Sequence, residues 1–502
     1  MNPSGKGLRV TDWIAHRAAV LPVQPAVIES SGATTYGQLD TLVAQACVTL
    51  AHLGVERGTR VGVLTSNSLS FVVLVHALVR TGAILVPLNT RLTDPEVRYQ
   101  IENAAVSVLL VDDASVGRAI GRDASPAARV LRLEDLRLDD LVSTRVDAPV
   151  RAPGALPTIN LDDWQGILHT SGTTGRPRGA VITNSNHWWS ACASAFNLGL
   201  HADDRWLLTL PAYHIGGLSI LFRAAIYGIG VVLHRRFGPE EVWASLVRDG
   251  VTIVSLVPTM LERLLEEAAP ARHALRCVLL GGAAASPALL ARAAARGVPV
   301  VQTYGLTECC SQVATLAPAD AITRPGSSGK PLLGIELRIE REGEDGAGQI
   351  LVRGPTISPG YCDRHTIRPI VDAGGWFHTG DYGQIDPHGY LYVLDRRSDL
   401  IVSGGENVYP AEVEAILRGH DGVVDACVVA RGDSTWGQVP VCALTTHGAP
   451  RADLVEDLAA YCGERLAPFK IPREFRVVEE LPRTSTGKLR RGEVRRWFGG
   501  AP

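Results

Sequence analysis

The chain has 502 residues, of which 46% are hydrophobic and 20% are charged. This composition is ordinary for a folded protein and excludes a disordered or fibrous chain. The 49 basic and 52 acidic residues leave a formal charge of −3, so there is no basic excess for a nucleic-acid partner. At about 150 residues for each domain, the length predicts roughly three structural units.

The start of the chain does not resemble an export signal, because Asp12, His16 and Arg17 interrupt any apolar run. The most apolar stretches, 71–87 and 218–233, contain charged residues and glycines. Each indicates a helix followed by a buried strand rather than a membrane span. We therefore expect a soluble, cytoplasmic protein without a membrane partner.

The nine cysteines and fourteen histidines are scattered, without the paired spacing of a zinc site or an HExxH motif. The odd cysteine count favours a reduced chain. The adjacent Cys309 and Cys310 suggest redox chemistry, but we expect buried, inert thiols.

Helix and strand signals alternate over the first third of the chain. Thr35 and Gln38 form a capping box that begins a helix, and Thr93 begins another with a proline in its first turn. Residues 60–65 and 106–111 indicate buried strands. The alternation continues from about 164 to 314 and predicts parallel sheets covered by helices.

The last third has a different pattern, with short strands and turns at 335–339, 348–353 and 390–394. These strands predict a small β subdomain. The polar run 395–399 indicates a linker, beyond which a compact α+β unit ends in a basic tail. Residues 114–157, earlier in the chain, indicate an irregular surface excursion.

The strongest motif is HTSGTTGRPRG at 169–179. Its hydroxyls come from Ser171, Thr173 and Thr174, and its glycines let successive backbone N–H groups surround an anion, which suits a polyphosphate. The spacing is not that of a Walker A loop. The alternative is a flexible surface loop of small residues.

Two further motifs suit a nucleotide. YGLTE at 304–308 follows the strand-like 298–302, and ligands gather at strand ends of α/β sheets. Tyr304 offers a face for a base, Thr307 a hydroxyl for a phosphate, and Glu308 an oxygen for magnesium. Alternatively, this is a core tyrosine with a glutamate at a helix start.

Asp381, in GWFHTGD, is a carboxylate at a glycine turn, suited to two ribose hydroxyls. An Asx-turn is the alternative. Lys488, in PRTSTGKLRR, places an ammonium on a turn of small residues. Such a group can stabilise developing phosphate and carboxylate charge, whereas a merely solvated basic tail is the alternative.

Together these motifs resemble the adenylate-forming superfamily of acyl-CoA synthetases, firefly-type luciferases and peptide-synthetase adenylation domains. The resemblance covers about residues 9–492. Within the superfamily, stretches 211–228, 255–260 and 395–400 are most similar to o-succinylbenzoate–CoA ligases of menaquinone synthesis. Related aryl and alkyl acid ligases share such stretches.

The resemblance implies an α/β fold. A large N-terminal domain, residues 1–395, would consist of two stacked αβα subdomains and a small β subdomain. Residues 396–400 would form a hinge that pivots at Ser398. A small, mobile α+β domain would follow at 401–502.

The resemblance also implies site residues. The phosphates of ATP are expected to contact Thr170, Ser171, Gly172, Thr173, Thr174, Gly175 and Arg178. Tyr304 is expected to contact adenine, and Thr307 the α-phosphate. Asp381 and Arg396 are expected to contact the ribose. Arg178 stands where lysine is more usual, which keeps the charge but changes its shape. Lys488, Thr174, Glu308 and His214 are the expected catalytic residues, with Glu308 also holding Mg²⁺.

The acid pocket is expected from His214, Arg223, Gly281, Gly282 and Ala283, with Gly404 and Gly405 lining the CoA tunnel. Tyr213, Phe222 and the small residues 281–284 would make this pocket roomy and apolar, for an aromatic or polycyclic acid. Arg223 could meet a second carboxylate, as o-succinylbenzoate requires, or it could pair elsewhere.

The implied activity is an ATP-dependent, AMP-forming acid–CoA ligase that uses ATP, Mg²⁺ and CoA. One alternative is an enzyme that only adenylates its acid and passes the adenylate to a carrier protein or a separate thiolating partner. Another is a catalytically silent nucleotide-binding scaffold. Relatives commonly form homodimers, so a homodimer is expected by analogy.

Overall fold

The computed structural model describes residues 7–112, 115, 128–133, 155–171, 177–268, 270, 272–283, 285–321, 323–341, 346–396, 400–448, 451–483 and 489–499. For residues 171, 341, 395, 396 and 411, the backbone alone is described. Most of the predicted surface excursion at 114–157 lies outside these ranges.

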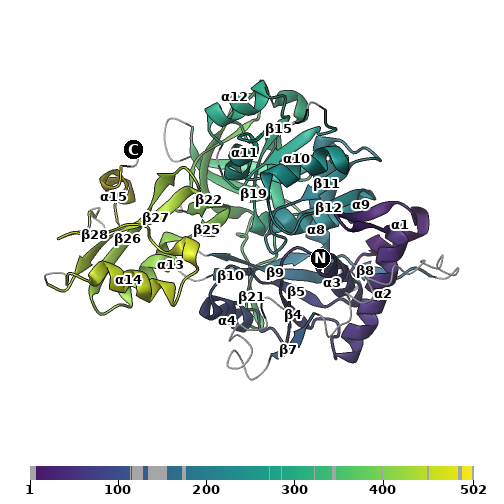
Figure 1. Ribbon diagram of the computed structural model, residues 1–502, viewed down its shortest axis with the longest axis horizontal. Helices are drawn as coiled ribbons and strands as arrows, with labels where there is room; N and C mark the ends of the chain where they lie inside the picture. The colour runs from purple at the N-terminus through teal and green to yellow at the C-terminus, as the bar shows by residue number, and fades with distance from the viewer. Residues whose placement is uncertain are drawn as a thin grey trace.

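Two large sheets form the centre of the N-terminal part (Figure 1). The eight-stranded sheet has the order β21 (Thr366–Arg368), β20 (Tyr361–Asp363), β10 (Pro177–Thr183), β9 (Trp164–Ser171), β5 (Ile84–Pro87), β4 (Arg60–Leu64), β6 (Val108–Val111) and β7 (Arg129–Arg132). The nine-stranded sheet has the order β17 (Lys330–Pro331), β16 (Ser311–Thr315), β15 (Val300–Leu306), β14 (Cys277–Leu280), β13 (Ile253–Leu256), β11 (Arg205–Leu208), β12 (Gly230–Leu233), β2 (Pro25–Glu29) and β3 (Gly32–Thr35).

The prediction of parallel sheets holds from β9 to β7 in the eight-stranded sheet and from β15 to β2 in the nine-stranded sheet, and the remaining pairs of both sheets are antiparallel. Strands β9 and β10 pair antiparallel, as do β15 with β16 and β2 with β3. In each of these pairs, the two strands follow one another in the chain. A short connection between successive strands favours an antiparallel hairpin over a parallel crossover through a helix. A separate ladder joins β1 (Arg9–Thr11) to β8 (Thr158–Asn160).

Helices cover the sheets and fill the space between them. They are α1 (Trp13–Val20), α2 (Tyr36–His52), α3 (Leu69–Thr81), α4 (Asp94–Asn103), α8 (Asn184–Leu198), α9 (Ile215–Tyr227), α10 (Pro239–Arg248), α11 (Pro258–Leu264) and α12 (Pro287–Ala295). The capping box predicted at Thr35 and the helix start predicted at Thr93 are confirmed, and Thr93 also forms a capping box with Glu96. One apolar cluster joins α2, α3 and α9 to strands of both sheets, so the two layers share a core.

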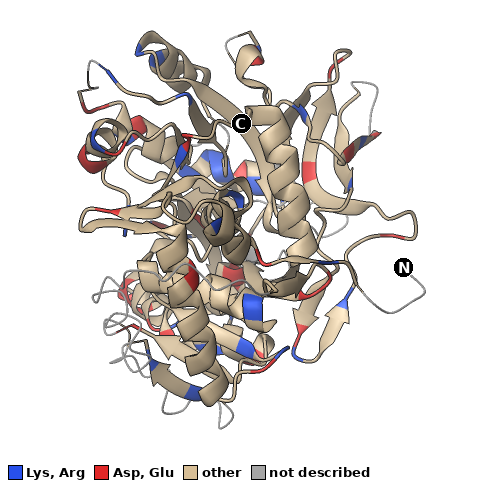
Figure 2. Ribbon diagram, turned by 90° about the vertical axis from the view of Figure 1, so that its right-hand side faces the viewer, with Lys and Arg blue, Asp and Glu red and all other residues tan. Residues whose placement is uncertain are grey.

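Both apolar stretches fold as predicted, into α3 followed by β5 and α9 followed by β12. Within the described part of the chain, no helix is long and apolar enough to cross a membrane. Cys309 and Cys310 are free and buried, and burial raises the pKa of Cys310 to about 12, as expected for inert thiols. Figure 2 shows acidic and basic residues interspersed over the ribbon.

The predicted β subdomain is confirmed as a four-stranded antiparallel sheet of β18 (Glu336–Arg341), β19 (Gly348–Arg353), β22 (Phe377–Ile385) and β23 (Leu391–Arg396). Strand β23 extends into the run predicted as a linker, because its end pairs with β22, where Asp381 lies opposite Arg396. Residues 397–399 lie outside the described ranges.

A last sheet contains only residues beyond 400. Its strands are β25 (Glu406–Val408), β24 (Ile401–Ser403), β27 (Gly437–Thr446), β26 (Val423–Asp433) and β28 (Phe475–Val477), and its helices are α13 (Pro410–Arg418), α14 (Leu454–Gly463) and α15 (Arg491–Trp497). We call residues 400–499 the C-terminal unit. An apolar cluster continues from α4 into α13 and α14, so this unit packs beside α4 (Figure 1).

Candidate active site

A cavity of about 300 Å³ lies where the nine-stranded sheet meets the C-terminal unit. Residues predicted for the phosphates, the magnesium ion, the acid pocket and the CoA tunnel line it: Thr170, His214, Arg223, Gly281, Gly282, Thr307, Glu308, Gly404 and Gly405. Tyr304 and Asp381, predicted for adenine and the ribose, are not among the described lining residues. His214 is the N-cap of α9, Gly281 follows β14, and Thr307 follows β15. The cavity therefore lies at the carboxyl ends of parallel strands, where α/β sheets bind ligands.

Glu308, which lines the cavity, is contacted by the hydroxyls of two other residues. Its Oε1 atom accepts hydrogen bonds from the hydroxyls of Tyr361 at 2.7 Å and Thr170 at 3.3 Å. The guanidinium of Arg178 lies over the Tyr361 ring, 4.4 Å from its centroid. A buried carboxylate beside a hydroxyl fits Mg²⁺, which takes oxygen ligands and usually one or two carboxylates.

Most of the phosphate loop cannot be placed against Glu308. Its residues Gly172, Thr173, Thr174 and Gly175 lie outside the described residues, as does the side chain of Ser171. Tyr361 was not singled out in the sequence. Its contact with Glu308 depends on β20 pairing beside β10, which no local motif reveals.

Tyr304 and Asp381, predicted separately for adenine and ribose, touch each other. The Tyr304 hydroxyl donates a hydrogen bond of 2.6 Å to Oδ2 of Asp381, and both residues are buried. Burial and the neighbouring carboxylate raise the pKa of Tyr304 well above its ordinary value, so this hydroxyl stays a donor. Arg396 lies opposite Asp381 where β23 pairs with β22, so the two residues predicted for the ribose lie side by side on adjacent strands.

Glu406 of the C-terminal unit lies buried among four polar groups of the N-terminal part. Its carboxylate accepts from Asn89 at 2.9 Å, Tyr213 at 3.2 Å and Arg91 at 3.3 Å, and it lies 3.0 Å from Nε2 of His214. Burial raises the pKa of this carboxyl, but His214, Arg91 and Tyr213 outweigh it and lower the value to about 2. Glu406 stands in the stretch SGGENVYP at 403–410, yet its partners come from distant loops.

Arg223 is buried and lines the cavity. Its side chain donates a hydrogen bond of 3.2 Å to the hydroxyl of Ser190, and its guanidinium lies 5.5 Å from the centroid of the Trp206 ring. Among the described residues, no carboxylate lies within ion-pair distance of it. Burial lowers the pKa of Arg223. No carboxylate of the described residues balances the positive charge of its guanidinium.

Two residues predicted for the acid pocket are placed elsewhere. The Phe222 ring stacks on His187 at 3.7 Å and meets Trp13 edge-on, so it belongs to the core rather than to the described lining of the cavity. Its neighbour Arg223 occupies the next position on α9 and faces the cavity instead. Ala283 is exposed beyond Gly282 and is not among the described lining residues.

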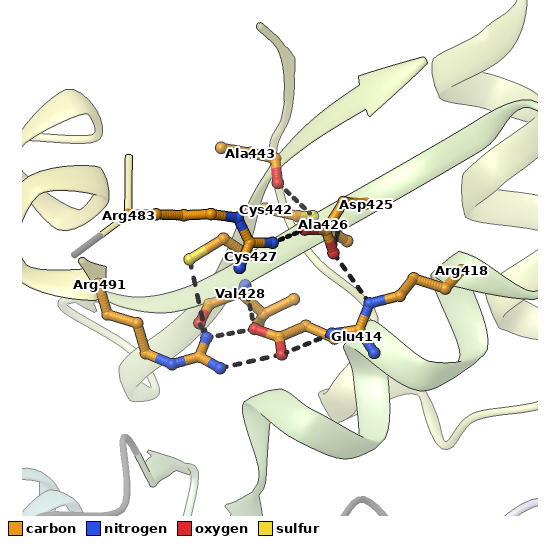
Figure 3. A network of polar contacts seen from close by, with 10 residues as sticks. All are labelled: Glu414, Arg418, Asp425, Ala426, Cys427, Val428, Cys442, Ala443, Arg483 and Arg491. Atoms are coloured by element: carbon orange, nitrogen blue, oxygen red, sulfur yellow. Dashed lines mark hydrogen bonds and ion pairs between the residues drawn. The ribbon is translucent and has the colours of Figure 1, made fainter. Parts of the chain in front are cut away.

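Lys488 and Ser398 lie outside the described residues, but both flanks of the Lys488 turn are anchored on the C-terminal unit (Figure 3). Arg483 pairs with Asp425, and Arg491 forms an ion pair with the buried Glu414, with Nη2 to Oε2 at 2.9 Å. The described residues on both sides of 484–488 are therefore held by ion pairs to other residues of the C-terminal unit.

Residues 14–362 match the AMP-binding enzyme family, and residues 412–488 match the AMP-binding enzyme C-terminal domain. The chain is 43% identical over 487 residues to a 2-succinylbenzoate–CoA ligase of Bacillus licheniformis, covering 96% of this chain and 99% of the relative. Among solved structures, it resembles a double mutant of o-succinylbenzoate CoA synthetase from Bacillus subtilis bound with the product analogue OSB-NCoA. That likeness has a TM-score of 0.88 and 38% identity, and it covers 97% of this chain and 99% of that chain.

Two other structures of the Bacillus subtilis enzyme are also 38% identical, one in complex with the acyl-adenylate intermediate OSB-AMP and one with ATP and magnesium ion. Each has a TM-score of 0.72 and covers 97% of this chain, with 98% and 100% of the respective structure covered. The chain therefore belongs to the AMP-binding enzyme family and is an AMP-forming ligase.

Proposed function

We propose that the chain is an ATP-dependent acid–CoA ligase whose substrate is 2-succinylbenzoate. Arg223 carries this proposal: a buried cation at the cavity, without a carboxylate partner among the described residues, suits an acid with a second carboxylate. 2-Succinylbenzoate has two carboxylates, one to be activated and one to remain. The Bacillus licheniformis relative, which matches 96% of this chain, carries the same substrate in its name.

In the first half-reaction, the substrate carboxylate attacks the α-phosphorus of ATP, and acyl-adenylate and pyrophosphate form. The residues near Thr170 and Thr307 would hold the phosphates, and Lys488 would stabilise the charge that develops between acid and phosphate. Mg²⁺, held by Glu308 when bound, would neutralise phosphate charge. Asp381, with Arg396 opposite it, would hold the ribose.

In the second half-reaction, the thiol of CoA attacks the acyl carbonyl, and AMP leaves. We propose that the C-terminal domain, 401–502, rotates about the hinge 396–400 at Ser398 between the two steps. The higher TM-score to the complex with a CoA-product analogue supports assigning the present arrangement to thioester formation. Lys488, anchored to this domain, would leave the acid when the domain turns.

Gly404 and Gly405 suit the passage of a thiol. Their φ angles of 57° and 84° favour glycine, and both residues line the cavity. A Cβ atom on Gly404 would approach the Trp436 ring to 2.5 Å, and one on Gly405 would point toward Val257. The two glycines therefore place backbone without side chains at this part of the cavity lining, which would suit the entry of a thiol.

The other expectations remain proposals. A homodimer is proposed by analogy with relatives, and light scattering would test it. Transfer of the adenylate to a carrier protein remains the alternative to CoA, and a cytoplasmic location remains the expected one. A silent scaffold would bind ATP without turnover.

The test is one incubation of the protein with ATP, Mg²⁺, CoA and a panel of acids, analysed by mass spectrometry. The panel includes 2-succinylbenzoate, benzoate, fatty acids and terpenoid acids. We expect 2-succinylbenzoyl-CoA with one AMP for each thioester. Acyl-adenylate without thioester would replace free CoA with another acceptor, and turnover of monoacids alone would reject the substrate.

A further inference from the structure

A buried cluster of three charges joins the C-terminal unit to α4. Lys470 lies between two carboxylates, with its Nζ atom 2.6 Å from Oε1 of Glu96 and 2.8 Å from Oε1 of Glu412. All three side chains are at most 8% exposed. Glu96 belongs to α4 and the other two to the C-terminal unit, so one of the two ion pairs crosses between them.

The two oxygens of Glu96 have different roles. Oε2 completes the capping box of α4, accepting from the backbone N–H of Thr93 at 2.8 Å, while Oε1 receives Lys470. The start of α4 therefore holds the Glu96 carboxylate in position without a contact from the C-terminal unit. A preformed acceptor loses little side-chain entropy when it takes its donor.

Glu412 already balances the charge of Lys470 from within the C-terminal unit. The carboxylate of Glu96 is thus not needed to balance the charge of the buried Lys470. Burying the Glu96 carboxylate costs free energy unless it has a cationic partner. Glu96 gains that partner only where the C-terminal unit packs against α4. Two nearby contacts cross at the same place: the Thr93 hydroxyl lies 3.2 Å from the Arg465 carbonyl, and Arg91 lies 4.9 Å from the centroid of the Phe469 ring.

We propose that Glu96 and Lys470 form a docking contact that positions the C-terminal domain for thioester formation. The pair touches neither the substrate nor the reacting atoms, so both are positioning residues. The contact forms in the arrangement that resembles the complex with the CoA-product analogue and is lost when the domain turns away. This inference rests on the proposed two-step function, and it makes the CoA step, rather than adenylation, depend on Glu96.

Glu96→Gln tests the proposal with little risk to folding. Glutamine retains the capping box, since it can accept from Thr93, and Lys470 keeps Glu412 as its counter-ion. The matched control is Glu102→Gln, an exposed position on the same helix. Adenylation is measured by pyrophosphate exchange, and thioester formation by single turnover of supplied acyl-adenylate with CoA.

We expect Glu96→Gln to slow thioester formation by about tenfold, as for loss of one charge-assisted hydrogen bond, and to leave pyrophosphate exchange within about twofold. Equal loss of both steps, or no loss of either, would overturn the proposal. Glu102→Gln should match the parent protein in both assays.

Small-angle X-ray scattering of the unliganded protein gives a readout that does not need activity. We expect Glu96→Gln to scatter less like the docked arrangement than the parent does, and Lys470→Met with Glu412→Leu to show the same change. Unchanged scattering in both variants would reject the docking role. A parent protein that forms no thioester would reject the proposed function, whereas the scattering comparison would still decide this inference.

Discussion

The Nε2 atom of His214 lies 3.0 Å from a carboxylate oxygen of Glu406, although the two residues are 192 positions apart. His214 is the N-cap of a helix of the N-terminal part and lines the cavity, and Glu406 begins a strand of the C-terminal unit. The contact connects the position of the C-terminal unit to the pocket itself. It exists only where that unit lies against the cavity.

Glu406→Gln is expected to weaken the CoA step and spare adenylation. The buried carboxylate accepts from Asn89, Tyr213 and Arg91, and a neutral amide weakens each of these charge-assisted contacts. Single-turnover thioester formation should fall by about tenfold or more. Glu480→Gln, an exposed carboxylate of the same unit, is the control, and a loss of pyrophosphate exchange equal to that of the CoA step would contradict the assignment.

Lys488→Ala should have the opposite profile. If this lysine stabilises charge only while the acid attacks ATP, its loss should lower adenylation by about a hundredfold or more, and a supplied acyl-adenylate should still react with CoA. The substitution Lys470→Ala is unsuitable as a control because Lys470 is buried. Arg490→Ala, at an exposed position two residues on, is suitable. Similar losses in both half-reactions would remove Lys488 from its proposed role.

Arg223→Met should change substrate preference. Since no described carboxylate pairs with Arg223, the substitution leaves no buried anion unbalanced, and the fold should tolerate it. We expect kcat/KM for 2-succinylbenzoate to fall by about a hundredfold, mostly through KM, and kcat/KM for monoacids to change little. Arg223→Lys, which retains the charge, should recover part of the preference. An unchanged ratio of diacid to monoacid would exclude recognition by Arg223.

The buried His76 and His187 and the half-buried His169 predict that the fold weakens in mild acid. Burial lowers the pKa of His76 to about 4 and that of His169 and His187 to about 3. The unfolded chain takes up these protons near pH 6.5 and the folded chain does not, so stability falls as pH drops below 6.5. Between pH 7.5 and 5.5, the loss should be about 1.4 kcal/mol for each histidine.

Urea unfolding midpoints at the two pH values check this expectation. His76→Leu should reduce the drop between them, because one site of proton uptake is removed, whereas His201→Leu at an exposed position should not. A midpoint that does not change between pH 7.5 and 5.5 in the parent protein would contradict the buried, neutral state of these rings.

The local elements could be predicted because their signals are local. The capping boxes at Thr35 and Thr93 define helix starts from side chains within one turn, and the glycine-rich motifs mark the strand ends around the cavity. The contacts that complete the site could not be predicted. Glu406 meets His214, and Lys470 meets Glu96, through the packing of the C-terminal unit against the N-terminal part, and such a contact leaves no characteristic spacing in the sequence.

Arg223 shows the same limit within one helix. Its neighbour Phe222 was expected in the pocket, but the turn of α9 sends the aromatic ring into the core and the guanidinium to the cavity. Apolar residues occupy most of this helix, so the periodicity does not define which face is buried in the core.

The apolar cluster that runs from α4 into the C-terminal unit includes Leu92, Val97 and Ile101 on one side and Val413 and Phe469 on the other. A domain rotation that separates these side chains would expose them to water, and exposure of apolar surface increases the heat capacity of the protein. The equilibrium between the two arrangements should then depend on temperature along a curve rather than a line. Because apolar association weakens on cooling, cold should favour the separated arrangement, and the CoA step should slow more steeply than adenylation.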